Sequence, residues 1–155
     1  NGTTIASSSN DKFAFIFDIR KLHKNKTKPQ PVYSVEHGAA IWGCRLSPNV
    51  DRLVTTSYDN TVRIADIKNG KNIKTISHNN KTGRWITPFR SKWLTNDAIC
   101  VGSMTRSIDI FSVVNNGVCY LRHDDVTSIS SSLAFCPQSQ MLFGGNSSGY
   151  VHCWA

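Results

Sequence analysis

The sequence predicts an all-β fold, the C-terminal portion of a β-propeller with about three and a half blades of about seven. Apolar runs separated by small polar turns recur along the chain, and their residues alternate as in half-buried strands. The recurring stretches are IASSSNDKFAFIFD (5–18), LVTTSYDNTVRIAD (53–66), LFGGNSSGYVHCWA (142–155) and, more loosely, ICVGSMTRSIDIFS (99–112). A strand–turn–strand unit that repeats at this interval is typical of four-stranded propeller blades.

The repeat divides the chain into four units. We expect a half blade at 1–18, blades at 31–66 and 71–112, and a last blade at 117–155 that lacks its closing strand. The clearest unit covers 37–66, where SPN and YDN mark turns between alternating stretches. Because a propeller needs 4–8 blades to close, this chain is expected to be part of a longer ring, with unpaired sheet edges at both ends.

Positive charge is concentrated in the first part of the chain. Residues 1–92 hold 16 Lys and Arg against 6 Asp and Glu, whereas residues 93–155 hold 2 against 4. A concentrated positive field favours an anionic partner such as nucleic acid or an acidic protein surface. A merely solvated basic surface fits the same numbers.

The sequence contains no pattern typical of an enzyme or of a metal site. The five cysteines include no C-x-x-C pair, so we interpret them as buried thiols. The histidines have no metal-ligand spacing, and no cofactor is expected. The stretch GNSSG (145–149) fits a nucleophile elbow, but the alternating residues after it predict a strand where that elbow requires a helix. No apolar run is long enough to cross a membrane.

Unit 37–66 closely resembles a WD40 repeat, with His37 placed 22 residues before Asp59. The resemblance implies that these two side chains meet Thr55 or Ser57 in a hydrogen-bonded cluster. Ala65 replaces the family's tryptophan, which truncates the network. Asp11 occupies the turn of Asp59 in the first unit. In the later units Thr105 and Ser148 stand there, so we expect those blades to depend more on packing.

The stretch Phe17–Asp18–Ile19–Arg20 resembles the W-D-x-R ending of WD-repeat receptors of cullin-4 ubiquitin ligases. The resemblance implies that Asp18 and Arg20 help to dock the blade onto the adaptor, damaged-DNA-binding protein subunit 1. The motif is short, and many propellers carry it by chance. The basic segment 17–31, which begins with this stretch, is predicted to be a solvated connection that could also touch phosphate.

The stretch HNNKTGRWITPFRSKW (78–93) contains two tryptophans with different predicted positions. Trp93 falls on the core position of an inner strand and is predicted to be buried. Trp85 falls in the preceding loop, on the face that carries the Asp59 turn. It is predicted to be exposed, although it could fold back to cap the blade.

This stretch, with VGSMTRSIDIF and GGNSSGYVHCW, closely resembles the WD-repeat protein 76 family and its fungal DNA-damage-binding counterparts. A more distant similarity reaches damaged-DNA-binding protein subunit 2, whose corresponding loop tip wedges into the minor groove at a lesion. Carried over, the tip is Gly83, Arg84 and Trp85. Gly83 and Arg84 differ in type from that tip, which puts lesion flipping in doubt.

The resemblance implies a nuclear, non-catalytic DNA-binding protein of the damage response. Lys81 and Arg84 are expected to contact phosphate, and Arg90 lies nearby, although strand alternation could aim it between blades. Such binding would be largely independent of sequence and sensitive to salt. The alternative is a protein-interaction scaffold whose basic loops meet histone-associated or other acidic chromatin proteins.

Overall fold

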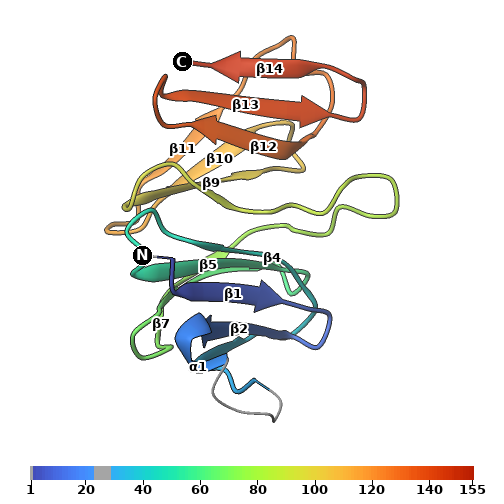
Figure 1. Cartoon of the computed structure of the whole chain (residues 1–155). Coiled ribbons are helices and arrows are strands. Elements are labelled where there is room, and N and C mark those ends of the chain that lie inside the picture. Colours follow the sequence, from blue (N-terminus) through green and yellow to red (C-terminus); the bar gives the residue numbers. More distant parts are fainter. Residues whose placement is uncertain (1, 23–28) are drawn as a thin grey trace.

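The computed structural model describes residues 2–22 and 29–155 of the chain. Four antiparallel sheets follow one another in space, in the arrangement of a partial WD40 propeller (Figure 1). One short helix, α1 (Ile19–Leu22), follows the second strand. In the described ranges no helix is long and apolar enough to span a membrane.

Each sheet is a meander of strands paired with their neighbours in the chain. The first contains β1 (Thr4–Ser8), β2 (Phe13–Asp18) and β3 (Tyr33–Glu36). The second contains β4 (Ile41–Leu46), β5 (Arg52–Ser57), β6 (Thr61–Asp66) and β7 (Asn72–Ser77). The third contains β8 (Lys92–Trp93), β9 (Ala98–Gly102), β10 (Ile108–Ser112) and β11 (Val118–Leu121), and the last contains β12 (Ser130–Cys136), β13 (Met141–Asn146) and β14 (Val151–Trp154).

The predicted units are offset from these sheets by one strand. The unit 31–66 begins with β3, which pairs with β2 of the first sheet, and the units 71–112 and 117–155 begin in the same way with β7 and β11. The first unit, predicted as a half blade at 1–18, therefore gains a third strand. Each of these units begins with the last strand of one sheet, which we call the outer strand, and its remaining strands belong to the next sheet.

The core lies between neighbouring sheets. Ile16 of β2 and Leu53 of β5 belong to the cluster between the first two sheets, whereas Val54, the next residue of β5, packs with Ile99 of the third. Cys100 contacts Leu133 of β12 in the last interface. Because successive residues of a strand point to opposite faces, each middle strand contributes to two cores.

One side of the stack carries the four hairpin turns between equivalent strands. Each of these turns has one residue with positive φ at the same position: Lys12 (74°), Asn60 (63°), Arg106 (64°) and Gly149 (83°). The β1–β2 and β13–β14 turns lie at the right of Figure 1, together with the long loop after β7. Helix α1 lies toward the opposite side. The turn that begins with Asp59 in one sheet thus recurs in all four.

Candidate nucleic-acid interface

The loop that joins β7 to β8 is much longer than the equivalent connection of the preceding sheet. From His37 the chain reaches β4 at Ile41, whereas from His78 it reaches β8 only at Lys92. The extra residues project from the molecule at the right of Figure 1. We call residues 78–91 the insert loop.

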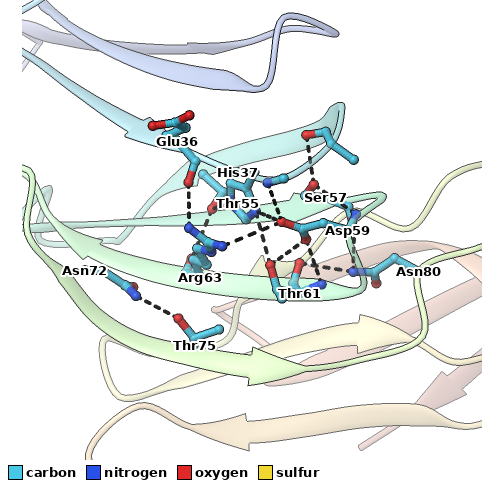
Figure 2. Close-up of polar contacts among 12 residues, drawn as sticks. Glu36, His37, Thr55, Ser57, Asp59, Thr61, Arg63, Asn72, Thr75 and Asn80 are labelled. Atoms are coloured by element: carbon cyan, nitrogen blue, oxygen red, sulfur yellow. Dashed lines mark hydrogen bonds and ion pairs between the residues drawn. The ribbon is translucent and has the colours of Figure 1, made fainter.

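The first arm of the insert loop is tied to the turn between β5 and β6. The His78 backbone N–H donates to the carbonyl of Asn60 at 3.0 Å, and the Asn80 N–H donates to the Asn60 side chain at 3.1 Å. The buried amide of Asn80 donates through Nδ2 to the carbonyls of Ser57, at 2.8 Å, and Thr61, at 3.1 Å (Figure 2). These bonds fix the position of this arm over the hairpin.

The second arm is held by packing and by a hydroxyl pair. Phe89 is fully buried between the second and third sheets. The backbone N–H of Ser91 donates to Thr56 Oγ1 at 2.9 Å, and the two hydroxyls lie 2.7 Å apart. The stem of Arg90 lies against Gly43, where a Cβ would come within 3.0 Å of Arg90 Cγ. Arg90 therefore covers the gap between two blades and stands at the base of the loop.

The tip carries the exposed residues. Trp85 has 87% of its surface exposed, and Lys81, Gly83 and Arg84 are exposed beside it. Gly83 adopts a φ of +71°, which an L side chain rarely adopts, and a Cβ there would meet open space. Among the residues that the structure describes, no carboxylate forms an ion pair with Lys81 or Arg84. The tip thus presents an exposed indole together with the exposed cations of Lys81 and Arg84.

Further basic groups lie on the inner strands below the loop. Burial lowers the pKa of Lys92, and the nearby Arg45 and Arg90 lower it further. The indole of Trp93 is buried and donates from Nε1 to the carbonyl of Arg45 at 2.9 Å, as expected of a core residue. Positive charge therefore continues from the tip of the loop toward the inner edge of the blades.

The structure brings His37 and Asp59 together, with Thr55 as the third member (Figure 2). His37 Nδ1 lies 3.0 Å from Asp59 Oδ2, and its Nε2 lies 2.7 Å from Thr55 Oγ1. Burial lowers the pKa of His37 despite the opposing effect of Asp59. Burial alone would raise the pKa of Asp59, but hydrogen bonds from Thr61, Gly38 and His37 lower it to about 2.

A second polar cluster, which the sequence did not predict, lies in the third sheet. His78 Nε2 lies 3.4 Å from Asp109 Oδ2 on β10, and Nδ1 lies 2.7 Å from Asn80 Oδ1. A chain of hydroxyls, Ser103–Thr105–Ser107, ends on Asp109 Oδ1, with the last bond at 2.6 Å. The turn position holds Thr105, as the sequence indicated, but this blade has a polar cluster of its own, whose carboxylate lies on strand β10.

One signal in the sequence could have revealed this cluster. His78 has the same place after an outer strand as His37, and Asp109 aligns with Arg63 when the hairpins are superimposed on their positive-φ residues. Strand β10 therefore carries the negatively charged Asp109 at the position where strand β6 carries the positively charged Arg63. A search for a displaced carboxylate would have found Asp109.

Asp18 and Arg20 lie on the side of α1, away from the insert loop. Arg20 donates to Asp18 from Nε at 3.0 Å and from Nη2 at 2.8 Å, and its side chain remains 72% exposed. The side-chain hydrogen bond from Arg20 is the main cause that lowers the pKa of Asp18 to about 2. Asp11 accepts from the N–H of Phe13 within its own turn. Most of the basic segment after Arg20 falls on residues 23–28, outside the described residues.

Other expectations concern chemistry. Among the described residues, no group of three His, Cys, Asp or Glu side chains could hold a metal. The GNSSG stretch forms the end of β13 and the turn to β14, a strand continuation without the helix that a nucleophile elbow requires. The expectation of buried thiols is correct for Cys100. Cys44 and Cys136 are half-buried, and Cys119 and Cys153 are exposed.

Comparison with known proteins agrees with this architecture. Residues 29–66 match the family model described as WD domain, G-beta repeat. The chain is 26% identical to the DNA damage-binding protein CMR1 of Phaeosphaeria nodorum over 97% of its length, and 29% identical to that of Emericella nidulans, again over 97%. It is 36% identical to the WD repeat-containing protein 76 of Xenopus laevis over 88% of its length. The chain belongs to the WD-repeat family of these proteins.

The match covers nearly all of this chain but only part of its relatives. It spans 33% of the Phaeosphaeria protein, 32% of the Emericella protein and 25% of the Xenopus protein.

Proposed function

We propose that this chain is part of a non-catalytic, damage-associated DNA-binding protein that contacts duplex DNA through the insert loop and acts in the nucleus. The relatives named DNA damage-binding protein support the class of ligand. The observation that carries the proposal is the exposed indole of Trp85, which follows Lys81 and Arg84 on a loop whose two arms are anchored.

The chemistry of the tip suits a nucleic acid. An indole that stacks on a base contributes about 1–3 kcal/mol, and every base has a face on which to stack. Apolar wedges in the minor groove need cations to hold the backbone, and Lys81 and Arg84 stand on either side of Gly83 for this purpose. Arg90 supplies a further cation at the base. Binding of this kind depends on salt and only weakly on sequence.

Replacement of Trp85 by alanine tests the proposal. In the full-length protein, Trp85→Ala should weaken duplex binding by about tenfold, the loss of one stacking contact. Tyr120→Ala is the matched control, because Tyr120 is an exposed aromatic, 54% exposed, on the outer strand β11. Duplex affinity would be measured by fluorescence anisotropy at fixed salt. An unchanged affinity in Trp85→Ala would exclude the indole as a DNA contact.

The competing function is a scaffold for acidic proteins such as histone-associated factors. The same loop offers Lys81 and Arg84 to carboxylates, which require no stacking. A loss of protein partners in Lys81→Ala together with duplex binding unchanged in Trp85→Ala would favour the scaffold.

We also propose that the Asp18–Arg20 pair docks onto the cullin-4 adaptor, damaged-DNA-binding protein subunit 1. Its support is geometric: the bidentate pair holds the guanidinium at the surface on the side of α1, where DNA on the insert loop would not cover it. Arg20→Ala should abolish co-purification of the adaptor, whereas the adjacent Lys21→Ala should retain it. If the adaptor still co-purifies with both variants, the Asp18–Arg20 pair is not needed for docking.

A further inference from the structure

The ring of His78 faces two groups that can only accept hydrogen bonds. Asn80 Oδ1 lies 2.7 Å from Nδ1, and its orientation is fixed because Nδ2 of the same amide donates to two backbone carbonyls. Exchange of the amide atoms would lose both bonds. His78 Nδ1 must therefore carry a proton and donate it to Asn80.

The second nitrogen of the ring faces a carboxylate. His78 Nε2 lies 3.4 Å from Asp109 Oδ2, within the distance of an ion pair but without the alignment of a hydrogen bond, and it has no hydrogen-bond partner among the described residues. Burial by itself would raise the pKa of Asp109, but the nearby His78 ring and the hydrogen bond from Ser107 outweigh burial, so that the pKa is lowered and the carboxylate is ionised. An ionised carboxylate has no hydrogen to donate. A neutral His78 would thus direct a lone pair at a negative oxygen.

Two aromatic rings also pack against His78. Phe89 and Phe111 pack edge-on against it, each at 6.0 Å between ring centroids. The β5–β6 hairpin holds the backbone beside the ring, because the N–H of His78 donates to the carbonyl of Asn60 and the N–H of Asn80 donates to the Asn60 side chain. In the part of the chain that the structure describes, Asp109 is the one charged group in contact with the ring.

We propose that His78, with a proton on both ring nitrogens, is the positioning residue that holds the insert loop in the orientation that meets DNA. The doubly protonated ring bridges Asn80, in the first arm of the loop, to Asp109 on strand β10. Phe89, in the second arm, closes against the same ring. One side chain thus fixes both arms of the loop that presents Trp85.

This inference rests on the proposed function and adds a pH dependence to it. If DNA binds the ordered loop, and the ordered loop prefers the protonated ring, then DNA binding and proton binding favour each other. Duplex affinity should fall as the pH rises, because loss of the second ring proton removes the attraction between His78 and Asp109.

The test compares pH profiles of duplex affinity in the full-length protein at constant ionic strength. The wild-type protein should lose about fivefold or more in affinity between about pH 5.5 and pH 8. Asp109→Asn and His78→Gln should each give a flat profile, since neither retains a carboxylate–imidazolium pair. His123→Gln is the control, because His123 is exposed and pairs with Asp125 outside the insert loop. A flat wild-type profile, or a slope retained in Asp109→Asn, would overturn the inference.

A measurement without DNA separates this inference from the proposed function. Trypsin should cut after Lys81 and Arg84 several times faster in Asp109→Asn than in the wild-type protein at the same pH, because the released loop reaches the protease. Equal cleavage rates would show that the His78–Asp109 contact does not hold the loop. Faster cleavage combined with unchanged duplex binding in Trp85→Ala would retain the positioning role and reject the DNA contact.

Discussion

The two histidine clusters of this chain begin from equivalent positions and reach different chemical solutions. In the second sheet, Nδ1 of His37 donates to Asp59, and Nε2 faces the hydroxyl of Thr55. A hydroxyl both donates and accepts, so it can supply a hydrogen to the neutral ring. The pKa of His37 is lowered by burial, in keeping with a neutral form.

In the third sheet the hydroxyl is missing. Val101 stands where Thr55 does in the second sheet, and the carboxylate approaches the ring from Asp109 on the strand instead of from the turn. The freed nitrogen of His78 faces Asn80, a residue of the insert loop. The difference teaches that a change of hydrogen-bond partner lets the equivalent histidine connect a blade to the insert loop.

The largest expected effect comes from removal of the turn carboxylate in the second sheet. Asp59 accepts hydrogen bonds from Gly38, Thr61 and His37, and its side chain is only 12% exposed. Asp59→Ala should lower the free energy of unfolding by about 2–4 kcal/mol, because the buried ring of His37 and the donors of Gly38 and Thr61 lose their acceptor. Urea-induced unfolding measures it. Asp11→Ala, in the equivalent exposed turn, should cost under about 1 kcal/mol. Equal losses in Asp59→Ala and Asp11→Ala would show that the contact between His37 and Asp59 adds nothing to stability.

Acidification tests the same cluster without a substitution. The folded-state pKa of Asp59 is about 2, below its ordinary 3.8, so its stabilisation is present above pH 3.8 and is lost as the pH falls toward 2. The loss is about 2 kcal/mol. The pKa of His37 is also lowered, so its contribution is complete above 6.5 and declines below that pH. Stability measured by urea unfolding at successive pH values should decline in both windows. If the stability of Asp59→Ala does not decline below pH 4, the wild-type decline in that window is due to Asp59. An unchanged decline in this variant would contradict the assignment.

Replacement of Thr55 by valine removes from the His37 cluster the hydroxyl that the His78 cluster lacks. Thr55→Val reproduces the situation at Val101 and leaves His37 Nε2 without its donor, at a cost of about 1–2 kcal/mol in the free energy of unfolding. Thr56→Val is not a suitable control because Thr56 holds Ser91 of the insert loop. Thr75→Val, on the exposed outer strand β7, serves instead and should be nearly neutral. A neutral Thr55→Val would show that the hydroxyl is dispensable to the ring.

The smallest expected effect concerns the indole that joins the two sheets. Trp93→Phe keeps the buried ring but removes the hydrogen bond from Nε1 to the carbonyl of Arg45. We expect a loss of about 1 kcal/mol in the free energy of unfolding, with the pH profile of duplex binding unchanged. A changed profile would mean that the third sheet transmits strain to the insert loop by a route other than His78.

The repeat, the four turns and the place of the long loop were predictable from the sequence alone. Alternation, small polar turns and a constant interval specify a blade wherever they occur, because these signals are local. The meeting of His37 with Asp59 followed from the resemblance of one clear repeat. The assignment of the outer strands to the preceding sheets was not predictable from the repeat bounds, because strand pairing decides it.

Tertiary structure decided what the exposed and buried polar groups do. Whether Trp85 capped the blade or pointed outward depended on the anchors of both arms of the loop, which come from Ser57, Thr56 and Asn60 in another part of the chain. The pairing of His78 with Asp109 depended on the register that brings β10 beneath the loop. Sequence determines which groups are available at each position, but a hydrogen bond needs two groups within about 3 Å, and only the packed sheets set that distance.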